Sequence, residues 1–505
     1  MTGEHEHVSE RVRAVWDLVV PAIREYAGVH AYDGEVMDMS PSAIGARLRR
    51  LRQGPPESNL HDETHLSAVE DGLEAMYGQA ECHRWNPLVH LENLDLACYE
   101  REYAPRSERE AARARHLRSW PEAVDGSLES LDDVSAPVAV ALLGAAEGLK
   151  TGVEEPEALA AHDRLCDRLR HFAEHGRDDA ALGSLLLADL LGAPEGTSVD
   201  LGRLEERADG ERRRLRERLA DECERYRHGS GADPAALVAE LVDDHPEADG
   251  IYATARAQIG ELRKYTSDQD LLPELGGECN VGPAPDSRRF AMAMMSWNGA
   301  YEEEAPAWYY VNPPDDSWDA SARKQWLAVF SDTTLPSITA HEVIPGHFAH
   351  GRMIRRIRGS HVRRSLCSAA FVEGWAHYAE ELMVEVGFRE DDPRFAIGVF
   401  VEALLRVTRL AVALGIHRAT MTVEEAARRF EQDAFLQGPA ARSEAARATF
   451  DPTYGRYTWG KLEIMSLRDE AIAAWGSRFS LRRFHEALLG LGAPPLGTIG
   501  DAIGD

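Results

Sequence analysis

Helical spacing of apolar residues over the first half of the chain is the feature that most restricts its fold. From Ser9 to about Tyr252, Ala, Leu, Glu and Arg dominate, and apolar residues recur at the three- and four-residue intervals of one helix face. Ser9, Ser40 and Asp200 stand where N-caps are expected, and Pro41 occupies a first helical position. The spacing predicts a mainly α-helical protein.

The composition changes near residue 270, where Gly, Pro and aromatic residues interrupt the helical spacing. The run Trp308–Asn312, with Tyr310 at its centre, has strong β propensity and stops at Pro313, which predicts an edge strand. Helical spacing resumes at about Ala320. We therefore expect a helical N-terminal half, 1–265, and a second half, 266–505, as two domains or as two walls of one groove.

Charge and hydropathy exclude several classes of partner. Among 505 residues, 44% are hydrophobic and 28% charged, which is typical of a globular protein. Acidic residues outnumber basic ones by 86 to 56, and the net charge of −30 disfavours nucleic acid and anionic lipid surfaces. No stretch has the ~18 uninterrupted apolar residues of a membrane span, and no apolar leader is apparent. We expect a cytoplasmic protein without nucleic-acid or membrane partners.

The six cysteines form no CxxC pair. This spacing argues against a disulfide framework and against a thiolate metal site, so we expect them to be reduced and mostly buried. Any metal site must then be built from histidines and carboxylates.

Two short segments carry the residues expected for chemistry: TAHEVIPGH, residues 339–347, and FVEGWAHYAE, residues 371–380. Two imidazoles and one carboxylate, here His341, His347 and Glu373, are a common ligand set for a catalytic zinc ion. Such a site leaves one position for a water molecule whose pKa falls toward ~7. Glu342, beside the first histidine, could accept that water's proton. The segments predict a hydrolase with one zinc ion per chain.

The interval between the two histidines is six residues rather than the four of the usual HExxH helix. At ~100° per residue, six positions leave the second imidazole about 120° from the first on a regular helix. Pro345 donates no backbone hydrogen bond and Gly346 tolerates unusual dihedral angles. We therefore expect the helix to bulge or break between His341 and His347.

Glu373, His377 and Glu380 stand at positions i, i+4 and i+7 and share one helix face. Such a polar stripe alone is more typical of a solvated face, but its pairing with the first segment favours ligands or groups that hold ligands. For His377 we favour a structural role, with a substrate contact as the alternative. His350, three residues after His347, is an alternative ligand if the helix breaks differently.

Three blocks, HEVIPGH, EGWAHYAE and YTWGKLEIMSLR, resemble those of the bacterial domain of unknown function 885 family. EGWAHYAE is also similar to the glutamate-bearing helix of the aminopeptidase N group. The resemblance implies a gluzincin-like metallopeptidase of mainly helical, zincin-like architecture, with a small β element beside a cleft that crosses the metal. It implies that His341, His347 and Glu373 bind zinc, that Glu342 is the base and that Tyr457 donates to the oxyanion. Tyr457 as a packing residue is an equal alternative.

Residues outside the metal set suggest how a substrate would bind. The strand containing Tyr310 could hold an extended peptide by backbone pairing. Arg456 or Arg468 could pair with a substrate carboxylate, as an exopeptidase requires. His377 is the third candidate contact.

We expect cleavage of amide bonds in small peptides or peptide-like metabolites. Two alternatives stay open. One is a zinc hydrolase of a non-peptide amide or ester, because the metal chemistry is the same. The other is a catalytically inactive helical binding protein, which would hold no stoichiometric metal.

Overall fold

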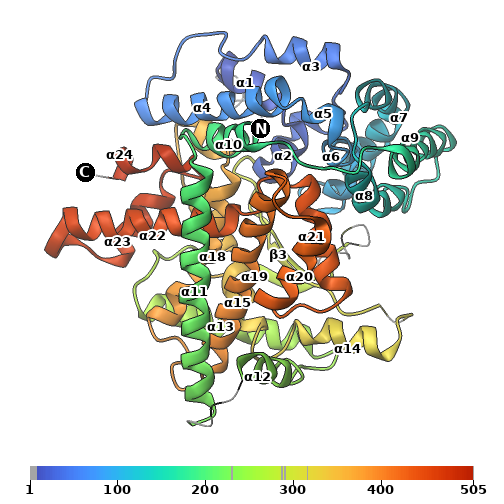
Figure 1. Cartoon of the computed structure of the whole chain (residues 1–505). Helices are drawn as coiled ribbons and strands as arrows, with labels where there is room; N and C mark the ends of the chain where they lie inside the picture. The colour runs from blue at the N-terminus through green and yellow to red at the C-terminus, as the bar shows by residue number, and fades with distance from the viewer. Residues whose placement is uncertain are drawn as a thin grey trace.

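The computed structural model describes residues 8–228, 231, 233–285, 288, 292–315 and 317–503. Helices predominate throughout these residues, as the apolar spacing predicts (Figure 1). The N-caps predicted at Ser9, Ser40 and Asp200 are confirmed, since each side chain accepts a backbone hydrogen bond from the first turn of its helix. None of the described helices is long and apolar enough to cross a membrane.

The first elements enclose a hydrophobic cluster of their own, to which Val362 and Leu366 from the second half also contribute. They are α1 (Glu10–Trp16), α2 (Val20–Ala22), η1 (Ile23–Ala27), η2 (His30–Tyr32), α3 (Pro41–Leu48), α4 (Leu60–Leu73), η3 (Glu74–Gln79) and α5 (Cys82–Trp85). A second cluster lies beside this one, on the right of Figure 1. Its elements are α6 (Leu88–Leu94), η4 (Ala97–Glu100), α7 (Arg106–Ser130), α8 (Ala136–Gly148) and α9 (Pro156–His175).

The largest hydrophobic cluster runs from Leu187 to Ile503 and includes residues on both sides of position 265. The elements up to the sheet are α10 (Ser184–Gly192), η5 (Ala193–Glu195), α11 (Leu201–Tyr226), α12 (Pro234–Leu241) and α13 (Ile251–Asp268). After the sheet come α14 (Ala320–Ala328), α15 (Leu335–Glu342), α16 (His347–Ile354), α17 (His361–Ser365), α18 (Ala369–Glu385) and α19 (Arg394–His417). The division of the chain at residue 265 stays a prediction.

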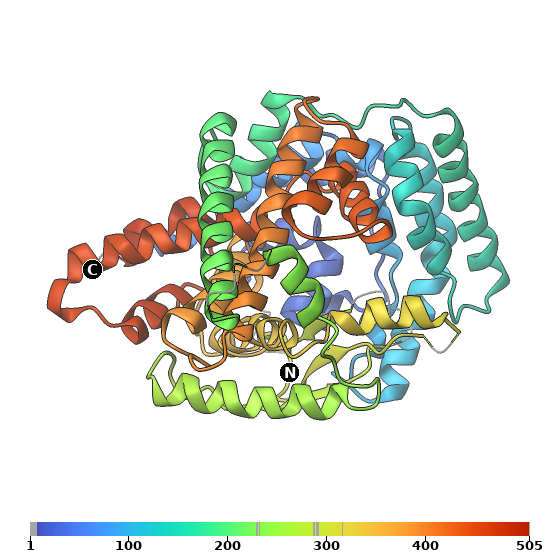
Figure 2. The same ribbon diagram turned by 60° about the horizontal axis from the view of Figure 1, so that its bottom comes forward.

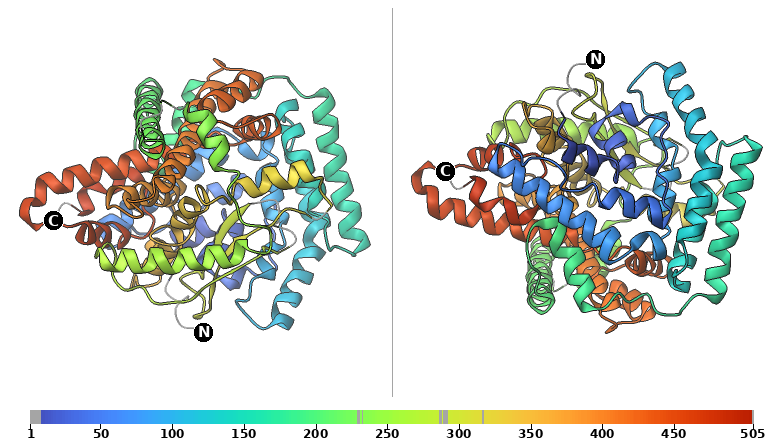
Figure 3. Two further views of the ribbon diagram at one scale, coloured as in Figure 1. Left: turned by 90° about the horizontal axis from the view of Figure 1, so that it is seen from below. Right: turned by 90° about the horizontal axis from the view of Figure 1, so that it is seen from above.

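The last elements are α20 (Val423–Asp433), α21 (Pro439–Phe450), α22 (Arg456–Trp475), η7 (Gly476–Arg478), α23 (Leu481–Leu489), η8 (Leu496–Thr498) and α24 (Gly500–Ile503). Helices α20 and α21 pack on the C-terminal part of α19 around a small fourth cluster. The end of α22 and the start of α23 form a hairpin that projects from the body in both views of Figure 3.

The short strands expected after residue 270 form one three-stranded sheet in the described part of the chain. Strand β3 (Ala307–Val311) pairs in parallel with β1 (Cys279–Gly282) and antiparallel with β2 (Ala293–Ser296). The prediction of an edge strand at Trp308–Asn312 is therefore wrong, because β3 is the central strand. Its two partners are four residues long and carry little periodic signal. Helix α13 contacts β1 and extends along the lower side of the molecule in Figure 2.

All six cysteines are free, and four of them are buried, as expected from their spacing. Cys279 is half-buried and Cys367 is exposed.

Candidate metal centre

The helix containing His341 breaks as predicted. Helix α15 ends at Glu342, α16 begins at His347, and the Ile344–Pro345 peptide bond between them is cis. A Cβ atom added to Gly346 would lie 1.7 Å from the carbonyl oxygen of His341, so only glycine fits this turn. The break turns His347 back toward His341, and their ring centroids lie 4.7 Å apart.

The third member of the cluster comes from α18. Ser368 caps this helix by accepting the backbone N–H of Phe371, and its hydroxyl donates to Glu195. Helix α18 crosses α22 so closely that a Cβ atom on Gly374 would lie 2.5 Å from the Gly460 backbone. These glycines of the EGWA and YTWGK blocks therefore allow Glu373 and Tyr457 to approach each other from two helices.

Glu373 Oε2 lies 3.5 Å from the Nε2 atoms of both His341 and His347. One ligand atom from each residue lies within 4.8 Å of the other two, and both histidines are buried. The buried Oε2 atom makes no hydrogen bond with the described residues. Two imidazole nitrogens and a carboxylate oxygen that converge without a hydrogen-bond partner have the donor chemistry of a zinc site, so the three residues fit the ion.

The carboxylate of Glu380 holds the first histidine in place. His341 Nδ1 donates to Glu380 Oε1 at 2.6 Å, which leaves Nε2 directed toward Glu373. A carboxylate on the far nitrogen of a ligating imidazole fixes the tautomer and orientation of the ring. Glu380 therefore orients the His341 ring, which agrees with its position on the same helix face as Glu373.

Arg406, in the middle of α19, anchors Glu380 from behind. Its guanidinium donates to Glu380 Oε2 at 3.1 Å, and both side chains are buried. Burial disfavours the ionised carboxylate, but Arg406 and His341 outweigh it and hold the pKa of Glu380 well below its ordinary value. Glu380 is thus an anion at neutral pH and accepts a hydrogen bond from the Nδ1–H group of His341.

Two carboxylates determine the ionisation of the imidazole in the metal-free site. Burial and the nearby Arg406 favour neutral His341, but Glu373 and Glu380 outweigh them and raise the pKa of His341 to about 9. Burial likewise opposes ionisation of Glu373, and the two imidazoles reverse this effect and lower its pKa. A metal ion must therefore displace a proton from the cluster.

Glu342 follows His341 directly in the chain, and Tyr457 lies beside the His341 ring. Glu342, the last residue of α15, is half-buried and forms no hydrogen bond or ion pair with the described residues. The Tyr457 ring stacks beside His341 with 6.4 Å between ring centroids, and the negative charge of Glu373 is one cause of its raised pKa, after burial. Its hydroxyl forms no hydrogen bond with the described residues, so both groups are available to a ligand.

The predicted arginines are engaged within the chain. Arg456 forms a bidentate pair with Asp451, with distances of 2.7 and 2.8 Å, and its guanidinium lies 5.7 Å from the centroid of Tyr457. Arg468 donates to Glu385 and to the hydroxyl of Tyr378. Arg456 is thus beside the candidate centre with its two terminal nitrogens occupied.

Two further histidines lie outside the cluster. His377 is fully buried, and its Nδ1 atom lies 3.7 Å from Glu380 Oε1. Burial lowers its pKa to about 4, so it is neutral. His350 donates to the carbonyl oxygen of Gly492 and is not among the three converging residues.

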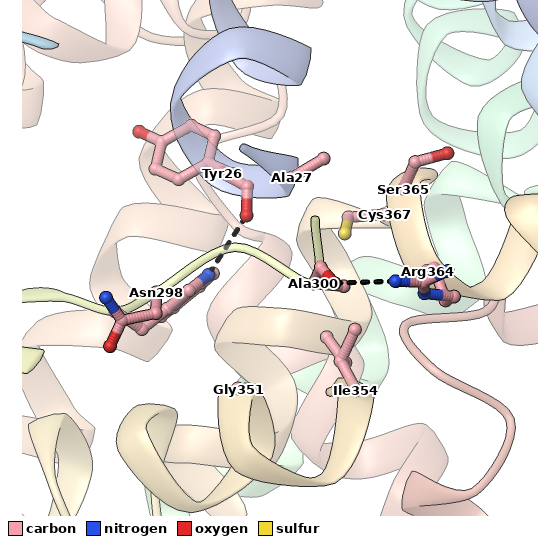
Figure 4. Close-up of a pocket in the computed structure, with 10 residues that line it drawn as sticks. Tyr26, Ala27, Asn298, Ala300, Gly351, Ile354, Arg364, Ser365 and Cys367 are labelled. Carbon is pink, nitrogen blue, oxygen red and sulfur yellow. Dashed lines mark hydrogen bonds between the residues drawn. The ribbon is translucent and has the colours of Figure 1, made fainter. Parts of the chain in front are cut away.

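Trp297 lies beside the candidate centre and lines two cavities. The sequence did not predict a role for this residue. Its ring lies 5.9 Å from that of His347. One, here called the Cys367 cavity, has Ile354 of α16 on one side and Tyr26 on another (Figure 4). The other is lined by Trp308 and Tyr310 and is here called the Trp308 cavity. Both are lined by Trp297.

The fold and the cluster define a mainly helical protein with a candidate His₂Glu metal centre. The model of the family described as bacterial protein of unknown function (DUF885) matches residues 106–503, and the chain belongs to this family. No curated protein matches the chain.

Two solved structures share the fold over nearly their whole length. A candidate lipoprotein of unknown function from Shewanella oneidensis is 20% identical, with a TM-score of 0.78 and coverage of 98% of both chains. A candidate lipoprotein from Colwellia psychrerythraea is 14% identical, with a TM-score of 0.74 and coverage of 98% of this chain and 99% of its own. At these identities the similarity is one of fold.

Proposed function

We propose that this protein is a zinc-dependent hydrolase that cleaves amide bonds in small peptides or peptide-like metabolites. The observation that carries the proposal is the convergence of His341, His347 and Glu373, with the unpaired Glu342 next to His341 at the end of α15. A gluzincin-like architecture agrees with the separate helix that carries Glu373, α18, whereas the two histidines come from α15 and α16 on either side of the break.

Each residue around the cluster has a separate role in the proposed hydrolysis. When bound, zinc acidifies a water molecule and polarises the scissile carbonyl. Glu342 accepts the proton of the attacking water and passes it to the departing amine. Tyr457 donates its hydroxyl proton in a hydrogen bond to the oxygen on which negative charge develops. Glu380 and Arg406 keep the His341 ring oriented throughout.

The corrected strand order supports β2, rather than β3, as the strand that binds the substrate. Both sides of β3 are paired, so it cannot accept a peptide, whereas β2 is an edge strand. The N–H of Asn312 donates to the carbonyl of Met292, so in an antiparallel pair the backbone groups of Ala293 and Met295 point to the open side. Trp297 follows β2 directly and touches His347. An extended substrate therefore pairs with β2 and passes the centre.

A substrate panel tests the proposal. Zinc-loaded wild type is incubated with a library of di- and tripeptides, non-peptide amides and esters, and products are identified by mass spectrometry. We expect peptide hydrolysis that falls by about a thousandfold in Glu342→Gln, the range for loss of a general base. Glu385→Gln, on the exposed end of α18, is the matched control and should keep full activity.

Three outcomes would count against peptide hydrolysis. Cleavage restricted to the esters or non-peptide amides would favour the alternative substrate class. Turnover that is equal in wild type and Glu342→Gln would remove the assigned base. No turnover of any compound would favour a binding protein.

A further inference from the structure

We propose that the Trp308 cavity is a binding site for one aromatic side chain of the substrate. The proposal rests on the proposed peptide hydrolysis and adds the class of residue that the enzyme selects. The cavity lies beside the end of β2, at Ser296, and three of its wall residues are Trp297, Trp308 and Tyr310, so a substrate side chain placed there would meet aromatic rings.

Rings held in fixed orientations line the cavity. Trp308 and Tyr310 stand on the same face of β3 and stack with 5.8 Å between ring centroids and 14° between ring planes. Tyr103 is fixed by stacking on His30 at 3.7 Å and by donating its hydroxyl proton to Asp33. Such preoriented flat walls favour an aromatic guest, because ring pairs contribute beyond the apolar area that they bury.

Charge at the cavity disfavours both kinds of ion. Arg101 lines it and is buried, with its guanidinium held by Glu302 and by the carbonyl oxygens of Glu25 and Trp297. Because buried Glu302 already balances this guanidinium, neither a cationic nor an anionic side chain finds an unpaired partner at the buried wall, whereas an aromatic ring can stack against the guanidinium. Glu102 also lines the cavity but is exposed, so solvent screens its charge.

The sheet connects this cavity to the candidate centre. Tyr309 points to the opposite face from Tyr310, and its hydroxyl lies 3.4 Å from that of Thr339 on α15, the helix of His341. A peptide paired with β2 projects alternate side chains to the two faces of the sheet. One residue then faces α15, and its neighbour faces Trp308 and Tyr310. Ser296, in register with Trp308, lines the cavity at the end of β2.

Peptide selectivity of a Trp308 variant tests the site. For tripeptides that differ only by Phe or Ala at one position, we expect wild type to prefer Phe by about tenfold or more in kcat/KM at one position of the series. Trp308→Ala should reduce this ratio toward one, mainly through KM, and Trp308→Phe should retain most of it. Trp318→Ala, an exposed tryptophan outside the cavity, should leave the ratio unchanged.

A second measurement separates failure of this site from failure of the hydrolase proposal. N-acetylphenylalaninamide is titrated into zinc-loaded wild type, Trp308→Ala and Trp318→Ala, and binding is followed by ligand-observed NMR. Binding that weakens about tenfold only in Trp308→Ala supports the cavity even if no peptide is cleaved. Peptide cleavage with a Phe-to-Ala ratio that is the same in wild type and Trp308→Ala overturns it. No binding of the amide, together with no aromatic preference in wild type, also overturns it.

Discussion

Replacement of Glu380 by glutamine should weaken zinc binding without altering any of the three proposed ligands. In wild type, His341 Nδ1 donates to the Glu380 carboxylate at 2.6 Å, and Arg406 keeps that carboxylate ionised. A glutamine of the same shape carries no charge, and its amide accepts the imidazole proton more weakly. Loss of such a partner typically reduces metal affinity by about 10–100-fold, or ~1.4–2.7 kcal/mol.

The assay is competition for zinc with a chromophoric chelator, performed on wild type, Glu380→Gln and Glu381→Gln. Glu381 is the matched control because it also accepts hydrogen bonds from buried or half-buried cations, Lys461 and Arg214, but contacts neither histidine. Both variants should unfold at lower temperature, and only Glu380→Gln should bind zinc more weakly. Equal zinc affinity in Glu380→Gln and wild type would refute the positioning role, and equal weakening in both variants would attribute the effect to general destabilisation.

Three further predictions concern the turn, the oxyanion donor and the protons of the centre. Gly346→Ala should lose zinc, and its free energy of unfolding in urea titrations should fall by about 2 kcal/mol or more, because no Cβ fits beside the His341 carbonyl. Gly260→Ala is the control and should not be destabilised, because the space around Gly260 is open. Tyr457→Phe should lower kcat about a hundredfold with zinc content unchanged, and an unaltered kcat would make this tyrosine a packing residue. Because the pKa of metal-free His341 is about 9, apparent zinc affinity should rise about ninefold from pH 7 to 8 and about fivefold from pH 8 to 9, and a flat profile in calorimetric titrations would contradict the proton displacement.

Local signals in the sequence predict the helices and the break between the histidines. N-caps, apolar spacing and the Pro345–Gly346 pair act within one or two helical turns, so the structure confirms them without reference to distant residues. Strand order is different, because it depends on pairings between segments about 28 residues apart, as for Cys279 and Ala307. The sequence identified β3 by its propensity and assigned it the wrong place in the sheet.

The candidate site shows the same division between local and distant information. The two motifs place the converging residues on three helices, and the i, i+7 spacing indicates Glu380 beside Glu373. Arg406 and Arg409 stand inside the long apolar run that becomes helix α19, and arginines in such a run indicate buried ion pairs without indicating the partner. No local signal indicates Trp297, because its contact with His347 depends on the path of the chain after β2.

Zinc content of the purified protein tests the central claim most directly. Wild type, His341→Ala, Glu373→Ala and His350→Ala are each loaded with zinc, freed of loosely bound ions and analysed by elemental mass spectrometry. His350 is the matched control, because it is a buried histidine on the same helix as His347 but binds the Gly492 carbonyl instead. The account predicts about one zinc ion per chain in wild type and His350→Ala and none in the other two. No zinc in wild type, or equal zinc in all four proteins, would contradict it.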